Sequence, residues 1–592
     1  MTRILPLFLL LASCAGSVQA TDAGAELQQL FDDHWEWTLR EAPTFASHLG
    51  DLRYNHQWPD ASLPAIERRH QDDKAFLERA RKIDAAQLTP ADRLNRELFI
   101  YKLEREVDEF AFGGYLMPMN QMGGIQDENS TADALTFTEL KHFDDWLARL
   151  QGLPTYIEQT IGLMREGMRR GVLPPKHVMR RSLDQVRKQF VDDAEKSLYF
   201  KPFLKFPDAI TPDDRERIAS GARTVISEEI VPAYRKLLEF LEKEYVPACY
   251  EEIGAWRMTD GDAYYTARAK HYTTTNLTPN EIHEIGLAEV KRIRAEMDAI
   301  LRELKFEGTF AEFAEKLRTD PQFYFESPAE LLAAYRDLCK RIDPELPKLF
   351  RKLPRTPYDI QPVPDNMAPD VTTAYYRPPA ADGTRPGTYF VNLYQPESRP
   401  KYEMEALSLH EAMPGHHLQI ALASELTDVP KFRRFGGFTA YVEGWGLYSE
   451  GLGTDLGLYK DPYTRFGRLT YEIWRAIRLV VDTGMHHKHW TRQQAIDFFL
   501  TNAAKAELDI VNEVDRYIAW PGQALAYKVG ELKILELRAR AEKQLGDKFD
   551  VREFHDVILH QGAVPLNVLE QIVDAWLAEK KSPRLRVGAS TP

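Results

Sequence analysis

Apolar residues recur every three or four positions along most of the chain, with charged residues between them. Residues 85–110 and 216–245 carry this pattern over several consecutive turns. A spacing of three and four is typical of helices that bury one face and expose the other. The pattern therefore predicts a mainly α, large multi-helical fold, without internal repeats.

Two of the predicted helices are marked by their first residues. Thr278 is followed by Pro279 and then by Glu281, and Thr491 is followed three positions later by Gln494. Threonine with glutamate or glutamine three residues on is the capping box of a helix start, and proline is favoured at the first helical position. We expect one helix to begin at each of these threonines.

One segment breaks the helical pattern. Residues 355–400 are rich in proline and contain two short β-favouring runs, at 372–376 and 387–394. They predict a small β-hairpin or sheet edge before the segment that carries the chemistry, although a structural loop would give the same spacing. A boundary near residue 265 would divide the mature chain into an N-terminal helical half, 21–265, and a C-terminal helical half, 266–592.

Composition narrows the classes of function. The chain has 592 residues and a formal net charge of −14, which disfavours nucleic acid as a partner. After the first twenty residues no stretch has the roughly 18 apolar residues that span a bilayer. Beyond that stretch only Cys249 and Cys339 remain, which we interpret as buried free thiols rather than a disulfide or zinc ligands.

The first twenty residues are typical of an export signal. One basic residue is followed by a short apolar run and then by small residues. Residues 11–14 match a bacterial lipobox that would leave a lipidated Cys14, and residues 18–20 match an ordinary signal peptidase site. We expect a periplasmic protein or outer-membrane lipoprotein of a Gram-negative bacterium, whose membrane contact is a lipid anchor. The oligomeric state is left open.

The segment "HEAMPGHHLQ", residues 410–419, resembles the H-E-x-x-H zinc motif but has Pro414 where the second histidine belongs. On a regular helix His416 would face about 120° away from His410 and lie about 9 Å further along the axis. Two nitrogens that each bind one Zn²⁺ at about 2.0–2.1 Å must be much closer than that. A straight helix therefore cannot form this site.

Pro414 and Gly415 offer a way to deform the helix. Proline removes a backbone donor and clashes with the preceding turn, and glycine adopts backbone angles closed to other residues. If two residues bulge out of the helix, His416 reaches the position of the second ligand beside His410. If three bulge out, His417 takes that position instead. We favour His416 and keep His417 as the alternative.

The remaining parts of a zinc site follow in order. Glu411 occupies the place of the general base that takes a proton from water. Glu443, 27 residues after His416, is the candidate third ligand of one Zn²⁺ ion, and Glu450 shares its helix face and could orient a ligand. A lone His-Glu pair is more often structural, and the histidines at 486–490 fit a solvated loop. The combination, in one order, favours a metal site.

These motifs resemble a large bacterial family called domain of unknown function 885, in which H-E-x-x-P-G-H-H is followed by E-G-W. The resemblance runs from near residue 50 to near residue 573. The family in turn resembles the helical gluzincin metallopeptidases, including thimet oligopeptidase, neurolysin and angiotensin-converting enzyme. Their V-E-x-P-S-x-x-x-E segment maps onto "VEGWGLYSE" and implies Glu443 as a ligand, and their Gly-His maps onto Gly415 and His416 with two residues inserted before them.

The peptidase resemblance implies further roles. A tyrosine or histidine from a late helix would stabilise the oxyanion, for which Tyr527 is our first choice and Tyr517 the second. On an earlier helix Arg478 could hold a substrate carboxylate, and Asp482 and His486 could support the site. Arg478 and Asp482 are equally well explained as a surface i,i+4 pair, and Tyr517 as a residue at the edge of the core.

The resulting expectation is an exported zinc hydrolase that cleaves short peptides in a central cleft between two helical halves. The strand predicted at residues 389–394 would align the substrate through its backbone edge. Two alternatives remain: a non-catalytic envelope lipoprotein that binds a metal or a peptide, and a zinc hydrolase of non-peptide amides.

Overall fold

The structure is a computed structural model that describes residues 22–365, 368–369 and 372–581. The predicted mainly α fold with one small sheet is confirmed. The export segment and both of its processing sites lie outside the described residues. Within those ranges no helix combines the length and the apolar character needed to cross a membrane. Cys249 and Cys339 are buried free thiols, as expected.

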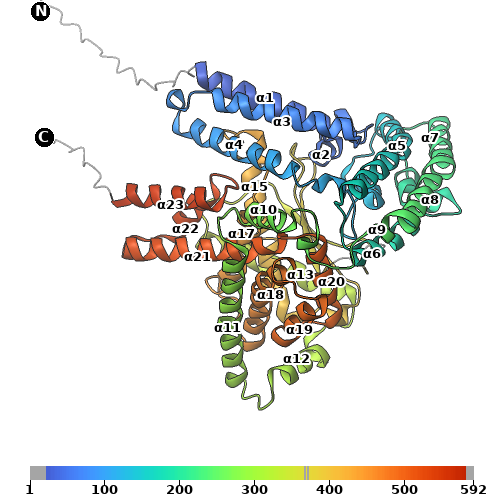
Figure 1. Ribbon diagram of the computed structural model, residues 1–592. Helices are drawn as coiled ribbons and strands as arrows, with labels where there is room; N and C mark the ends of the chain where they lie inside the picture. The colour runs from blue at the N-terminus through green and yellow to red at the C-terminus, as the bar shows by residue number, and fades with distance from the viewer. Residues whose placement is uncertain (1–21, 366–367, 370–371, 582–592) are drawn as a thin grey trace, which may run out of the picture.

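The N-terminal part of the chain forms two groups of helices with separate cores (Figure 1). The first group runs along the top of the view and comprises α1 (Asp22–Glu41), α3 (Leu63–Lys82) and α4 (Pro90–Phe110). The second comprises α5 (Leu140–Arg170), α6 (Lys176–Arg187), α7 (Pro212–Val225) and α8 (Val231–Phe240). The helical pattern of residues 216–245 thus continues through α7 and α8, which are joined by the π-helical segment Ile226–Ile230.

The C-terminal part is built around two long helices that pack against each other, α11 (Pro279–Glu303) and α18 (Pro462–His486). The other main helices of this part are α13 (Pro328–Ile342), α14 (Met404–Glu411), α15 (His416–Ser424), α17 (Thr439–Leu452), α19 (Arg492–Asn502), α20 (Glu507–Ala519), α21 (Ala526–Leu545), α22 (Val551–Leu559) and α23 (Leu566–Lys581). The predicted capping boxes of Thr278 and Thr491 are both confirmed. Residue 265 lies inside α10 (Gly261–Thr273).

The small sheet has three strands in the order β1-β3-β2: β1 (Tyr358–Pro362), β3 (Gly387–Val391) and β2 (Ala374–Arg377). β3 is parallel to β1 and antiparallel to β2, so both of its backbone edges are used within the sheet. All five residues of β3 are also buried. The hypothesis that residues 389–394 align a substrate through a free backbone edge is therefore wrong for β3. Free edges in this sheet belong to β1 and β2.

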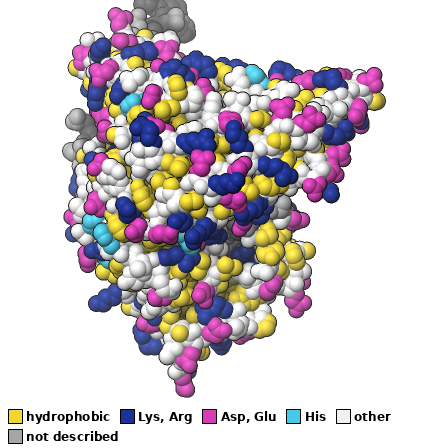
Figure 2. Space-filling model, turned by 45° about the vertical axis from the view of Figure 1, so that its right-hand side comes forward, with side chains coloured by type: hydrophobic (Ala, Val, Ile, Leu, Met, Phe, Trp, Pro, Cys, Tyr) yellow, Lys and Arg dark blue, Asp and Glu magenta, His cyan; other side chains and the backbone are white. Residues whose placement is uncertain are grey.

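Charged side chains are mixed in sign over the molecular surface seen in Figure 2. Lysine and arginine alternate with aspartate and glutamate there, and no continuous basic stripe crosses that face. A basic stripe is the electrostatic feature that nucleic acid binding requires.

Two glycines set the close crossing of α17 and α21. A Cβ atom added to Gly444 would lie 2.5 Å from the backbone of Gly530, and one added to Gly530 would lie 1.9 Å from the carbonyl oxygen of Ala440. The two backbones therefore touch, which leaves no room for a side chain at either position. This crossing sets the relative positions of Glu443 on α17 and Tyr527 on α21.

We expect Gly444→Ala to destabilise the protein by about 1–3 kcal/mol, because the new methyl group must push the two helices apart. Gly451→Ala on the same helix is the matched control, since a Cβ atom there meets no atom within 4 Å. That control should be neutral or slightly stabilising, because alanine is the better helix former. Urea unfolding monitored by circular dichroism measures both, and equal midpoints would contradict the close contact.

Candidate metal centre

The two histidines of the predicted motif lie on two separate helices. α14 ends at Glu411, residues 412–415 form a turn with a cis Met413–Pro414 peptide bond, and α15 begins at His416. The expected bulge within one helix is therefore corrected to a full break. A Cβ atom on Gly415 would lie 1.9 Å from the carbonyl oxygen of His410. Only glycine lets the chain turn back this closely.

The break is fastened to α17 by side-chain hydrogen bonds. The carbonyl oxygen of Pro414 accepts a hydrogen bond from Trp445 Nε1 at 2.9 Å and one from Ser449 Oγ at 3.4 Å. A Cβ atom at Gly446 would lie 2.8 Å from the His410 ring, so this glycine leaves the space that the imidazole occupies. α17 thus positions both the turn and the first histidine.

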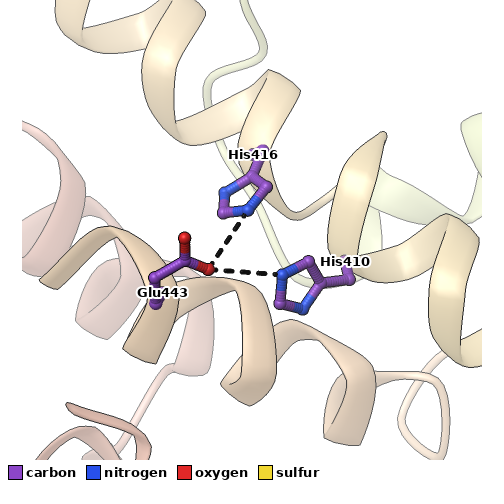
Figure 3. A group of neighbouring side chains, drawn as sticks. All are labelled: His410, His416 and Glu443. Carbon is purple, nitrogen blue, oxygen red and sulfur yellow. Dashed lines mark ion pairs between the residues drawn. The ribbon is translucent and has the colours of Figure 1, made fainter. Parts of the chain in front are cut away.

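Three side chains converge at this point, as Figure 3 shows: His410 from the end of α14, His416 from the start of α15 and Glu443 from α17. Oε2 of Glu443 lies 3.5 Å from Nε2 of His410 and 3.5 Å from Nε2 of His416. The three ligand atoms all lie within 4.8 Å of one another. His410 and His416 are buried, and the side chain of Glu443 is 18% exposed, so the group opens to solvent on one side.

These distances fit a tetrahedral zinc ion. Two ligand atoms about 2.0–2.1 Å from one Zn²⁺ at tetrahedral angles lie roughly 3.4 Å apart. Oε2 of Glu443 is buried and has no hydrogen-bond donor among the described residues, because 3.5 Å exceeds the length of a charge-assisted hydrogen bond. Burial opposes ionisation of Glu443, but His416 and His410 outweigh it and hold the pKa of the carboxyl well below its usual range. An ionised oxygen without a donor is what a cation would satisfy.

Glu450 orients the first histidine. Its Oε1 lies 2.9 Å from Nδ1 of His410, and Arg475 approaches the same oxygen at 3.4 Å. Burial would lower the pKa of His410, but the neighbouring carboxylates of Glu443 and Glu450 outweigh it and raise the pKa to about 9. A carboxylate that holds the far nitrogen of a histidine is the usual support of a metal-binding imidazole.

Glu450→Gln should weaken zinc binding about 10–100-fold, because the amide removes the negative charge behind His410. Competition with a chromophoric chelator measures this affinity. Glu405→Gln is the control: this residue lies on α14 but accepts its hydrogen bond from the backbone of Tyr459. A Glu450→Gln affinity equal to that of the control would contradict the orienting role.

The neighbouring histidine points elsewhere. His417 Nδ1 lies 2.9 Å from the hydroxyl of Tyr376, and its Nε2 lies 3.1 Å from the carbonyl oxygen of Thr356. Burial lowers the pKa of His417 to about 4, so the ring is neutral. Both nitrogens are therefore engaged away from Glu443. The structure places His416, and not the alternative His417, beside His410 and Glu443.

Two further residues of the predicted mechanism are neighbours of His410, one along the chain and one in space. Glu411 is the last residue of α14 and is half-buried, and its side chain makes no hydrogen bond or ion pair with any described residue. Tyr527 of α21 is also half-buried, and its ring lies parallel to that of His410 with centroids 6.5 Å apart. Burial and the nearby charge of Glu443 raise the pKa of Tyr527, which keeps the phenol protonated.

Arg478 lies behind Tyr527 and not on the surface. Its guanidinium carbon is 4.3 Å from the centroid of the Tyr527 ring. Nε donates to the hydroxyl of Tyr517 at 2.9 Å, and Nη2 pairs with Glu513 at 3.1 Å. The alternative that Arg478 and Asp482 form a surface pair is wrong, because both are buried. Tyr517 is fully buried and braces this arginine rather than facing the ligands.

Asp482 and His486 lie further along α18, away from the three ligands. Asp482 accepts hydrogen bonds from the hydroxyl of Tyr265 at 2.5 Å and from the amide of Gly522 at 3.2 Å. The ring of His486 lies between the amide of Ala255 and the carbonyl oxygen of Tyr517. The hydrogen bonds of these two side chains go to Tyr265, Gly522, Ala255 and Tyr517, and not to His410, His416 or Glu443.

Sequence reasoning missed the residues that brace the site. Trp445 and Ser449 hold the Pro414 turn, Arg475 pairs with Glu450, and Glu513 pairs with Arg478. Only Trp445 carried a signal, because it is the tryptophan of the E-G-W segment. The other three depend on helices that meet only in the folded chain.

The sequence matches a family model over residues 43–573, and that family is described as "Bacterial protein of unknown function (DUF885)". The chain belongs to the DUF885 family. No curated protein matches this DUF885 sequence.

Two solved structures share the DUF885 fold seen here. One is a proposed lipoprotein from Colwellia psychrerythraea, with 30% identity, a TM-score of 0.89, and coverage of 95% of this chain and 100% of that one. The other is a proposed lipoprotein of unknown function from Shewanella oneidensis, with 16% identity, a TM-score of 0.71, and coverage of 93% and 100%. The second likeness concerns the fold alone.

Proposed function

We propose that this chain is an exported zinc-dependent hydrolase that cleaves short peptides. The observation that carries the proposal is the convergence of His410, His416 and Glu443 at distances that fit one zinc ion. Two histidines and a glutamate with one open position form the ligand set of catalytic zinc sites in metallopeptidases.

The number of ligands favours catalysis over a structural zinc. Structural zinc sites are closed by four protein ligands. Within the described ranges the group has three members. Two residues could supply a fourth ligand, but both already form hydrogen bonds elsewhere. His417 is bonded to Tyr376 and Thr356, and Glu450 is bonded to Nδ1 of His410. The open position would be left for water or substrate.

A zinc ion held here would supply a Lewis acid that activates water and polarises the scissile carbonyl. The free, half-exposed carboxylate of Glu411 would accept the proton from that water and then deliver it to the leaving amine nitrogen. The protonated phenol of Tyr527 would donate a hydrogen bond to the developing oxyanion. Arg478 would keep Tyr527 in place from behind.

Two resemblances support the substrate class and the location. The H-E pair of residues 410–411 and the two acids of "VEGWGLYSE" resemble the zinc-binding segments of helical gluzincin peptidases, which extends the proposal from amides in general to peptides. Residues 11–14 match a lipobox, and both solved neighbours are described as proposed lipoproteins, which supports an envelope lipoprotein.

Metal analysis followed by a peptide digest tests the function. We expect about one zinc per chain by mass spectrometry, and cleavage of a mixed peptide library that stops with chelator and returns with added zinc. A parallel set of acyl anilides and other non-peptide amides separates the hydrolase alternatives. If zinc binds but no substrate is cleaved, the alternative of a non-catalytic metal-binding protein is favoured. If the chain has no affinity for zinc, the proposal is overturned.

A further inference from the structure

A second concave site lies at the start of α17, the helix that carries Glu443. It is a cavity of about 170 Å³ between α4, α10 and the segment of residues 432–439 that leads into α17. Tyr101, Lys102 and Arg105 line it from α4, and Arg433 lines it from the opposite side. None of these residues belongs to the candidate metal centre.

The cavity wall has an excess of positive charge. Lys102 is neutralised by Glu106, whose oxygen lies 2.7 Å from its ammonium group. Arg105 and Arg433 have no carboxylate within ion-pair distance among the described residues. Arg105 donates instead to the hydroxyl of Tyr101 at 3.1 Å. Arg433 therefore has no counter-charge in the described part of the chain, and Arg105 interacts with a carboxylate, that of Glu109, only beyond ion-pair distance.

Of the two arginines, Arg433 gives the stronger indication of an anion site. Arg433 is only 5% exposed. Its guanidinium donates hydrogen bonds to two neutral oxygens, the side-chain oxygen of Asn95 and the backbone oxygen of Gln561. Its Nε has no hydrogen-bond partner. Burial lowers the pKa of Arg433 to about 10. A buried guanidinium is normally paired with an acid, because the unpaired charge is costly.

The start of α17 adds donors to the same wall. Thr439, its first residue, lines the cavity together with Gly436 and Gly437. Phe438 stands at the N-cap and offers no side-chain acceptor, and the amides of Thr439 and Ala440 bond to no other described residue. Free amides at the positive end of a helix bind anions.

We propose that this cavity binds a small anionic group, a carboxylate or a phosphate, between Arg105, Arg433 and the first turn of α17. The anion would supply the missing counter-charge of Arg433 and cap the helix. Glu443 lies four residues after Thr439, about 6 Å further along the helix axis, so the bound anion would stabilise the helix that supplies the third metal ligand. The site is independent of the proposed hydrolysis.

Thermal unfolding of the mature, metal-free chain after dialysis tests this site, since phosphate then has no metal to bind. Inorganic phosphate and succinate are titrated separately, with sodium chloride at equal ionic strength and neutral succinamide as references. We expect a saturable rise in Tm with phosphate, with succinate, or with both. Saturation with phosphate alone assigns a phosphate-bearing ligand, and saturation with succinate assigns a carboxylate.

Three variants decide whether the effect belongs to this cavity. Arg105→Gln should weaken the anion about tenfold, which corresponds to one lost charge-assisted hydrogen bond. Arg433→Gln should weaken it further; if that variant does not fold, Arg105→Gln decides alone. Arg93→Gln is the matched control, because Arg93 is an exposed residue of the same helix α4. An unchanged Tm in the parent chain, or equal affinity in Arg105→Gln and Arg93→Gln, would overturn the proposal.

Discussion

Replacing Glu411 by glutamine is expected to abolish peptide hydrolysis while zinc stays bound. Glutamine keeps the shape of the side chain but cannot accept the proton that water must lose. Loss of general acid–base catalysis typically lowers kcat by 10²–10⁴-fold. KM should change little, because glutamine keeps the shape of the glutamate side chain and the substitution removes a proton acceptor rather than a substrate contact. Turnover of a fluorogenic peptide, together with zinc content, measures both quantities.

The matched control for this substitution is Glu397→Gln. Glu397 is exposed, makes no hydrogen bond to a described residue, and lies between the sheet and α14. Its variant should keep full activity. If Glu411→Gln retained the activity of the control, another residue would have to be the base.

The second large effect concerns two adjacent histidines. His416→Asn should reduce zinc from about one ion per chain to a trace, because the group then has only two ligands. His417→Asn should leave zinc and turnover intact and lower stability by about 1–3 kcal/mol, since the partners of His417, the Tyr376 hydroxyl and the Thr356 carbonyl, are disturbed. Zinc content by mass spectrometry and urea unfolding measure the two variants.

Each of these two variants is the control for the other, because the two positions are adjacent and the substitution is the same. The opposite outcome, with zinc lost in His417→Asn and kept in His416→Asn, would reassign the second ligand. Loss of zinc in both would point to a disturbed turn rather than to a lost ligand, and a lowered stability of both variants in urea unfolding would then show it.

Local signals in the sequence were sufficient for the helices and for the residues of the candidate site. The spacing of apolar residues and the caps at Thr278 and Thr491 depend on neighbours within one or two turns, so they could be interpreted without the fold. The grouping of His410, His416 and Glu443 followed from chain spacing and the chemistry of zinc, and the structure brings these three together.

Non-local features could not be inferred in this way. Pro414 signalled a deformation, but a full break between α14 and α15 is held by Trp445 and Ser449 from another helix. The central position of β3 depends on pairing with both β1 and β2, which the run of β-favouring residues does not encode. Whether Arg478 is on the surface or buried depends in the same way on α20 and α21 packing over α18.

The contact of α17 with α21 through Gly444 and Gly530 has a thermodynamic consequence. Zinc would bind only while α17 is packed against α21. This helix supplies Glu443, Glu450, and Trp445, which holds the Pro414 turn. A ligand that binds only the native form raises the unfolding free energy with its concentration. Metal binding and the packing of α17 against α21 are thus thermodynamically coupled. Without zinc, the contact between these two helices should be the first to open.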